Sequence, residues 1–290
     1  MLGCLLNKPK STTSFDGIDS NGTATFKYKV PHTVCRNKFM PLSATMAVFD
    51  ELSTVGLISL DKSHRWGVSV NLSTSLVRQP REGEDLVMLV KYNKMGKTLS
   101  FCEMALKDSK GDLVAIGNHT KFMPVSWLYD NFLSLPMILP IVLNLFWSFT
   151  STSVKRTWLG KKYIPPAPEG ENLESTADIE GILPSFAMQF NEAQGTFDFI
   201  ARQLHCNPMS FHGGAAAMAA EEACVLAAER AGLGPDLFLK KLDMQYLSAI
   251  NKSEKNLVSI LVDKVAGSDG HVKGSLSQKG QGKMLFEAKF

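Results

Sequence analysis

The sequence is poor in cysteine, with five cysteines in a chain of 290 residues, and they lie far apart. It contains no C-x-x-C pair and no cluster of cysteine with histidine. This argues against a structural zinc site and against a disulfide framework. We therefore expect no bound metal, and free thiols in a reducing compartment. The cysteines are Cys4, Cys35, Cys102, Cys206 and Cys224.

An excess of one charge is also lacking. The chain has 31 basic and 28 acidic residues, for a net charge of +3, and the basic residues are spread along it. A nucleic-acid-binding protein needs a concentrated basic face, so we expect no nucleic-acid partner. The hydrophobic fraction of 44% is too high for a disordered chain, and it suits one large domain or two of ordinary size.

A clear targeting signal is missing from residues 1–25, which we interpret as an N-terminal tail. Its apolar start, Met1–Leu6, is too short for a secretory signal. Lys8 and Lys10 precede hydroxyl residues as in a transit peptide, but no arginine comes before Arg36. The tail therefore leaves the compartment undecided.

The first half has the pattern of an α+β fold. Residues 41–58 are almost wholly apolar and have the length of a helix that protein must surround on all sides; Asp50 and Glu51 lie within it. Residues 66–76 alternate between large apolar and small residues, as in a strand with one buried face. Turn residues separate three further predicted strands, at 84–93, 98–107 and 112–123.

The second half repeats this order. A helix rich in small residues is predicted at 212–231; it contains the adjacent acids Glu221 and Glu222 and ends before Gly232 and Gly234. Four strands are expected after it, at 237–250, 256–265, 270–277 and 282–290. The repeated order indicates an internal duplication.

Residues 125–185 separate the halves as an apolar insert followed by a proline-rich linker. Residues 132–150 carry no charge, as in a transmembrane candidate, but Pro136 and Pro140 interrupt any helix there. A single span would also put two packed halves on opposite sides of a membrane. The sequence leaves three readings: contact with a membrane surface, packing on protein, or a true span.

Chemistry is indicated where the second predicted helix begins, at His212, Gly213 and Gly214. Two glycines at a helix N-terminus expose backbone N–H groups, to which the helix dipole adds positive potential. Such a site suits the oxyanion of a thioester, although three such residues can equally be an ordinary tight helix start. Glu221 follows His212 by nine residues, as Asp50 follows Pro41, so the two acids occupy matching places.

Four motifs then make the chain resemble the hotdog-fold acyl-CoA thioesterases of the 4-hydroxybenzoyl-CoA thioesterase group. They are Gly67–Asn71, Gly83–Asp85, Gly96–Phe101 and Gly117–Lys121. The resemblance implies a tandem hotdog, in which each unit is a long central helix wrapped by an antiparallel sheet. Unit 1 would span 26–124 and unit 2 would span 186–290.

The resemblance also implies a site shared by two units. In that family the helix acid is the base or nucleophile, and the glycine after the histidine supplies an oxyanion N–H from the opposite unit. Eight residues of helix rise about 12 Å, so Gly213 and Glu221 cannot serve one thioester carbon together. We therefore pair Asp50 with Gly213 and Gly214.

Neighbouring residues are assigned from the same resemblance. Thr54, one turn after Asp50, and Ser69 would hold a water, unless they are merely polar residues of a helix and a strand. Asn207 would orient the thioester carbonyl, and it stands one place later than the family pattern. His212 is expected to shape the helix start rather than to act as a base.

At the mirror site Glu221 would face Leu42 and Ser43 in place of the glycines, and Val225 would replace the threonine. We predict one competent site and one decayed site, while Glu221 as a second working acid stays open. Lys94, Lys97 and Lys121 are candidates for the phosphates of coenzyme A, or else they are solvated surface lysines.

The predicted function is hydrolysis of acyl-CoA to a free acid and coenzyme A, within fatty acid metabolism. No cofactor is expected beyond the coenzyme A of the substrate. The resemblance suggests an intracellular protein of mitochondrion or cytoplasm, membrane-associated if residues 132–150 reach a bilayer, and able to assemble into homo-oligomers. The rival reading is a non-catalytic paired-hotdog subunit of a larger assembly.

Overall fold

The computed structural model describes residues 13–61, 65, 67–123, 186–201, 212–232, 237–248, 250, 257–266, 270–278 and 281–290. The insert with its apolar segment 132–150, the linker that follows it, Asn207 and Gly234 lie outside these residues. No helix in the part of the chain that is described is both long and apolar enough to cross a membrane.

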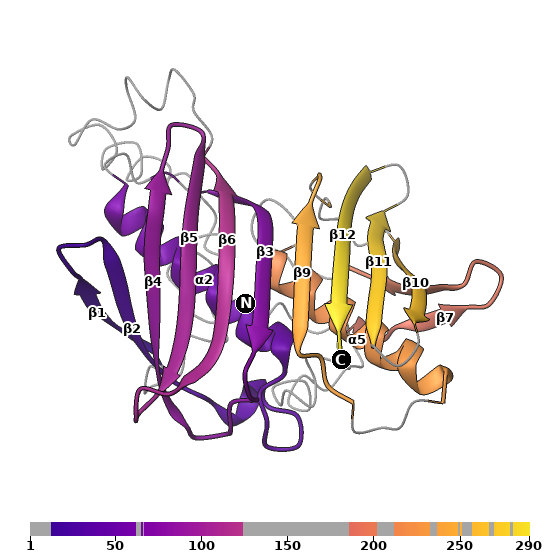
Figure 1. The fold of residues 1–290 in the computed structure, drawn as a ribbon. Helices are drawn as coiled ribbons and strands as arrows, with labels where there is room; N and C mark the ends of the chain where they lie inside the picture. The colour runs from indigo at the N-terminus through magenta and orange to yellow at the C-terminus, as the bar shows by residue number, and fades with distance from the viewer. Residues whose placement is uncertain are drawn as a thin grey trace, which may run out of the picture.

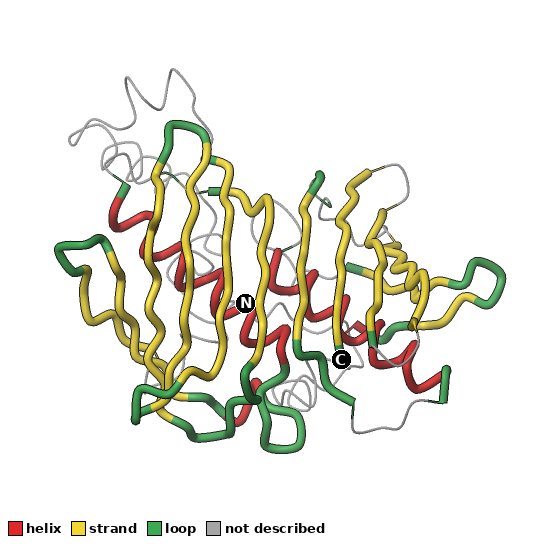
Figure 2. Tube along the Cα trace, in the orientation of Figure 1, coloured by secondary structure: helices red, strands yellow, loops and turns green. Residues whose placement is uncertain are grey.

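Two helices lie on one face of a single antiparallel sheet (Figures 1 and 2). Because strands alternate their side chains between two faces, the sheet turns one apolar face towards the helices. The elements of the first half are β1 (Thr13–Ile18), β2 (Thr23–Lys29), η1 (His32–Val34), α2 (Leu42–Leu60), β3 (Val68–Leu76), β4 (Asp85–Met95), β5 (Leu99–Asp108) and β6 (Leu113–Phe122). Those of the second half are β7 (Gln189–Asn191), β8 (Thr196–Ile200), α5 (Gly213–Arg230), β9 (Lys241–Tyr246), β10 (Leu257–Ala266), β11 (His271–Gln278) and β12 (Gln281–Lys289).

The strand order is β1-β2-β4-β5-β6-β3-β9-β12-β11-β10-β8-β7. Counted from either edge towards the middle, the two halves have the same order, and β3 and β9 join them with Asn71 opposite Gln245 and Ser75 opposite Lys241. The order of helix and strands predicted for each half, and the α+β class, are confirmed.

The boundary predicted for the N-terminal tail is wrong. Residues 13–25 are not a tail, because β1 and β2 form a hairpin that pairs with β4 at the sheet edge. The turn of this hairpin is closed by Asp19, which accepts two backbone N–H groups, and by Gly22 at φ +76°. The hairpin of β7 and β8 was likewise not predicted.

The two helices approach closely because small residues face each other. A Cβ on Gly214 would stand 2.7 Å from the Cβ of Ala47, so only glycine permits the observed crossing. The mostly apolar core is continuous across both helices and both halves of the sheet. Helix α5 ends where predicted, with Gly232 at φ +77°. The close crossing brings the N-terminus of each helix beside the middle of the other.

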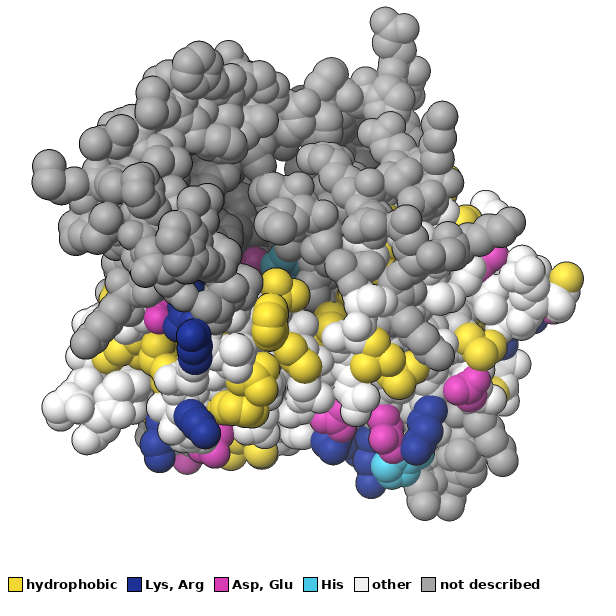
Figure 3. All heavy atoms as spheres, turned by 90° about the horizontal axis from the view of Figure 1, so that it is seen from above, with side chains coloured by type: hydrophobic (Ala, Val, Ile, Leu, Met, Phe, Trp, Pro, Cys, Tyr) yellow, Lys and Arg dark blue, Asp and Glu magenta, His cyan; other side chains and the backbone are white. Residues whose placement is uncertain are grey.

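The other face of the sheet is turned away from the helices. Val68, Phe122 and Leu99 stand side by side on β3, β6 and β5, and each is more than a third exposed. Figure 3 views the molecule from the top of Figure 1. It shows hydrophobic side chains gathered near the middle of this surface.

Candidate active site

Two adjacent carboxylates are buried in the middle of α2. Asp50 is 4% exposed and Glu51 is 7% exposed. The helix is surrounded by the sheet and by α5, so both carboxylates lose contact with water. Buried charges of this kind are costly unless they are paired and hydrogen-bonded. Their partners therefore define the site.

One oxygen of Asp50 is held by the first half. Its Oδ1 accepts hydrogen bonds from Lys121 Nζ and Ser69 Oγ, each at 3.2 Å. His119 Nε2 lies 3.6 Å from the same oxygen. These side chains come from β3 and β6, which pair directly beneath the helix. Ser69 lies beside Asp50, as predicted.

The other oxygen of Asp50 faces the second half. A Cβ on Gly213 would lie 2.9 Å from Asp50 Oδ2 and 3.2 Å from the hydroxyl of Tyr246. Tyr246 Oη donates a hydrogen bond of 3.1 Å to the carbonyl oxygen of Gly213. The structure thus brings together Asp50 and Gly213, two residues that the sequence analysis paired across the halves.

The tip of α5 is ordered by its own histidine. His212 is the N-cap residue, and its Nδ1 accepts the N–H of Gly214 at 3.0 Å. Its Nε2 lies 2.9 Å from Glu51 Oε1. The predicted oxyanion role of Gly214 is therefore corrected, because its N–H is already engaged. The N–H of Gly213 has no acceptor among the described residues.

His119 was not predicted as a site residue. Its ring bridges Ser53 Oγ at 2.8 Å and Ser69 Oγ at 2.9 Å, and it is 1% exposed. Burial, and after it the charge of Lys121, lower the pKa of His119 from 6.5 to about 3, so the ring is neutral at physiological pH. The signal in the sequence was the alternation that puts residues 119 and 121 on the same face of a strand.

Opposing effects set the charge of Asp50 and His212. Burial raises the pKa of Asp50, but nearby positive charge, that of Lys121 first, outweighs it and holds this pKa well below its ordinary value. Burial lowers the pKa of His212, but the hydrogen bond to Glu51 and the charge of Asp50 outweigh it and raise the pKa. Asp50 is therefore an ionised carboxylate beside the helix tip.

Thr54 lies one turn after Asp50, as expected. Its hydroxyl donates to the backbone carbonyl of Asp50 at 2.6 Å rather than to the carboxylate. Its predicted contact with a water stays a prediction.

The three lysines proposed for coenzyme A lie in two different environments. Lys94 and Lys97 are exposed where β4 turns into β5. Lys121 is only 5% exposed and is bound to Asp50, so its assignment to phosphates at the sheet edge is wrong. A lysine in a strand is usually solvated, and only the fold reveals its buried partner.

The mirror site differs in its helix tip. Glu221 is 5% exposed and its Oε2 accepts the backbone N–H of Ser43 at 2.7 Å. Burial raises the pKa of Glu221, although the hydrogen bonds from Ser43 oppose this. Val225 supplies no hydroxyl, and the buried Oε2 of Glu222 has no hydrogen-bond partner in the part of the chain that the structure describes. Glu221 thus caps the helix whose tip it faces.

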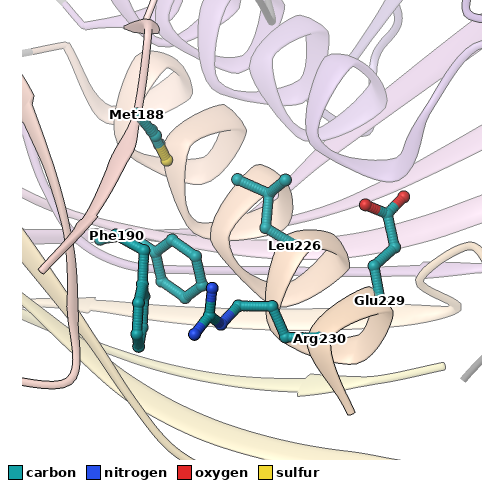
Figure 4. A pocket seen from close by; sticks show the side chains of 6 residues that line it. Met188, Phe190, Leu226, Glu229 and Arg230 are labelled. Carbon is teal, nitrogen blue, oxygen red and sulfur yellow. The ribbon is translucent and has the colours of Figure 1, made fainter. Parts of the chain in front are cut away.

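A separate cavity of about 400 Å³ lies at the other end of α5, against the hairpin of β7 and β8 (Figure 4). Arg230 stacks over Phe190 at 3.8 Å and pairs with Glu192 at 2.8 Å. The helix rise between Gly213 and Arg230 is about 25 Å, so this cavity is not part of the Asp50 site. Its lining residues are Met188, Phe190, Phe197, Leu226, Glu229 and Arg230.

The sequence comparison finds acyl-CoA thioesterases. No family model matches the chain. Acyl-coenzyme A thioesterase 13 of Homo sapiens is 34% identical over 80 residues, which are 27% of this chain and 56% of that protein. The chain thus spans about half the length of the curated relatives that it matches.

The structure comparison finds thioesterases over nearly the whole chain. An acyl-ACP thioesterase from Bacteroides thetaiotaomicron matches with a TM-score of 0.56 and 10% identity, covering 93% of this chain and 98% of that one. The 12:0-ACP thioesterase from Umbellularia californica matches with a TM-score of 0.56 and 9% identity, covering 94% and 98%. The predicted resemblance is confirmed: the chain has the fold of hotdog thioesterases and, over part of its length, a sequence similar to that of acyl-CoA thioesterases.

Proposed function

We propose that this protein hydrolyses acyl-CoA thioesters at the site where Asp50 meets Gly213. The observation that carries the proposal is the position of Asp50 Oδ2, 2.9 Å from where a Cβ of Gly213 would stand. An ionised carboxylate of one half thus lies beside the helix tip of the other half, where the N–H of Gly213 has no acceptor among the described residues. A base and an oxyanion donor that converge on one reacting atom are the minimum for acyl transfer.

The proposal treats the two halves as two hotdog units that arose by duplication. The shared strand order, from each edge to the β3–β9 junction, supports it. The matching positions of Asp50 and Glu221, each beside the start of the opposite helix, support it as well.

The tip of α5 would stabilise the oxyanion. The carbonyl oxygen of the thioester accepts the N–H of Gly213, at the positive end of the helix dipole. As negative charge develops on this oxygen, the hydrogen bond strengthens. Glycine is needed at 213 because any side chain would occupy the space between the helix tip and Asp50.

Asp50 would drive the attack with its free oxygen. In one route Oδ2 takes a proton from a water, whose oxygen bonds to the carbonyl carbon; the C–S bond then breaks and the thiolate takes up the proton. In the other, Oδ2 itself attacks the carbonyl carbon, the C–S bond breaks and the thiolate leaves, and water later cleaves the mixed anhydride. Both routes use the same geometry and both release a free acid and coenzyme A.

Ser69 and His119 would hold Asp50 in position. The neutral ring of His119 fixes the hydroxyl of Ser69, and Ser69 donates to Oδ1. Lys121 binds the same oxygen, so it leaves Oδ2 directed at the helix tip. Exposed Lys94 and Lys97 remain our candidates for the coenzyme A phosphates, which bind cations strongly.

A non-catalytic role is the competing proposal, and one observation favours it. Lys121 holds the pKa of Asp50 well below its ordinary value, which makes the carboxylate a weaker base. In a structural subunit, Asp50 and Lys121 would be only a buried ion pair between helix and sheet.

Thiol release from a panel of acyl-CoAs of different chain length distinguishes the two proposals. The enzyme reading predicts turnover of at least one substrate, and loss of it in Asp50→Asn. A purified, folded protein that releases no thiol from any chain length would establish the structural role.

A further inference from the structure

Glu51 makes a buried contact between the two halves that the proposed mechanism does not use. It follows Asp50 on α2 and is 7% exposed. Its Oε1 lies 2.9 Å from Nε2 of His212, the N-cap residue of α5 in the other half. Asp50 Oδ2 lies 3.8 Å from the same ring nitrogen.

The contact determines where the proton of the His212 ring lies. Nδ1 accepts the N–H of Gly214, and a nitrogen can accept only when it carries no proton. The proton of the neutral ring is therefore on Nε2, where it is donated to Glu51. Without this acceptor the ring could turn, or take the other tautomer, and Gly214 would lose its cap.

At the mirror position the corresponding acid has no histidine at the helix tip that it faces. Glu222 follows Glu221 as Glu51 follows Asp50, but Pro41 stands where His212 would be and offers no ring nitrogen. Among the described residues, the buried Oε2 of Glu222 has no hydrogen-bond partner. The acid-to-histidine contact thus exists at only one of the two helix tips.

We infer that Glu51 is a positioning residue of the Asp50 site, which holds the His212 ring so that it caps Gly214 and fixes the helix tip that presents the Gly213 N–H. The inference rests on the proposed function for its effect on catalysis, and on geometry alone for its effect on the ring.

Two variants of Glu51 distinguish the role of its acceptor oxygen from the role of its negative charge. Glu51→Ala removes the acceptor, and we expect kcat to fall about 10- to 100-fold with little change in KM, because a small misplacement of the oxyanion donor is costly. Glu51→Gln keeps an acceptor oxygen and should recover most of the rate. The matched control is Glu222→Ala, with wild-type kcat expected. A Glu51→Ala protein as active as this control would overturn the inference.

Nitrogen-15 NMR of His212 at pH 9 tests the ring without substrate. We expect the wild type to carry its proton on Nε2, Glu51→Gln to match it, and Glu51→Ala to show a changed tautomer ratio. A wild-type ring with a proton on Nδ1, alone or together with Nε2, would overturn the inference. If no acyl-CoA is hydrolysed at all, the proposed function fails, while this measurement still decides the role of Glu51.

Discussion

The two helix tips meet their acids in different ways. At the tip of α2, Glu221 accepts the N–H of Ser43 and so closes the helix end. At the tip of α5, Asp50 brings Oδ2 up to Gly213 while Lys121 and Ser69 hold its other oxygen.

In the proposed function, this difference separates a stabilising carboxylate, Glu221, from a reactive one, Asp50. An acid at a helix N-terminus is stabilising because it accepts the orphan N–H groups. A carboxylate that is to react with a substrate must be kept from accepting these N–H groups. Here a lysine and a serine hold one oxygen of Asp50, and the ring of His212 takes the N–H of Gly214.

Replacement of Asp50, the proposed catalytic acid, should have the largest effect on activity. We expect Asp50→Asn to lower kcat/KM about 10²- to 10⁴-fold, because the general base is lost. It should also destabilise the fold by about 3–5 kcal/mol, because Lys121 is left buried without its counter-charge. Urea unfolding and thiol release measure the two effects.

The double variant Asp50→Asn with Lys121→Met separates activity from stability. It should recover most of the lost stability and none of the activity. Recovery of activity in the double variant would show that Asp50 acts only as a partner for Lys121.

Filling the reactive tip should have the next largest effect. In Gly213→Ala the new methyl group would lie 2.9 Å from Asp50 Oδ2, which displaces the carboxylate or the substrate. We expect kcat/KM to fall about 10²- to 10³-fold, as on loss of an oxyanion-hole donor, and the circular dichroism spectrum to stay unchanged. A fully active Gly213→Ala protein would remove this helix tip from the mechanism.

Part of this site could be predicted from the sequence. The pairing of Asp50 with Gly213 was implied by the resemblance to hotdog thioesterases, and the rise of a helix and the matching positions in two repeats agreed with it. The hairpin of β1 and β2 also has a signal in the sequence, Asn21 before Gly22 between alternating residues, in place of most of which a tail over residues 1–25 was predicted.

Other contacts could not be predicted from periodicity. Lys121 and Glu51 bind partners far along the chain or in the other half, and nothing in their local sequence distinguishes them from solvated residues. A buried charge is stable only when the fold places an opposite charge beside it, so its burial cannot be predicted from the local sequence. The role predicted for the N–H of Gly214 also needed correction. Its acceptor is Nδ1 of His212, and the place of this atom depends on the rotamer of the side chain.

The stability contributions of His119, at the Asp50 site, and of Glu222, at the mirror site, should depend on pH in opposite directions. The pKa of His119 is lowered from 6.5 in the unfolded chain to about 3 in the fold, so the unfolded state binds more protons below pH 6.5. Its contribution to stability is therefore present above pH 6.5 and is lost as the pH falls towards 3. At pH 5 we expect a loss of about 2 kcal/mol. Urea unfolding of the wild type and of His119→Gln measures it, and equal pH profiles would contradict the assignment.

At the mirror end the sign is reversed. Burial raises the pKa of Glu222 from 4.5 to about 8, so the folded state binds the extra proton and stability is lost as the pH rises through 8. We expect Glu222→Gln to be more stable than the wild type by about 4 kcal/mol at pH 9 and equal to it at pH 4, measured by thermal unfolding. A variant that is less stable at pH 9 would indicate a partner for this carboxylate.

The smallest effect is expected for Glu221→Gln. Its amide oxygen can still accept the N–H of Ser43, so the helix tip stays capped. We expect kcat/KM to change less than about twofold. A loss comparable to that of Asp50→Asn would mean that both ends carry out catalysis.

The most direct measurement is a crystal structure with a non-hydrolysable acyl-CoA analogue. We predict that its carbonyl oxygen lies within hydrogen-bond distance of the Gly213 N–H, with the carbonyl carbon facing Asp50 Oδ2. An analogue bound between Glu221 and Ser43, or bound with its carbonyl away from both Asp50 and Gly213, would contradict the account.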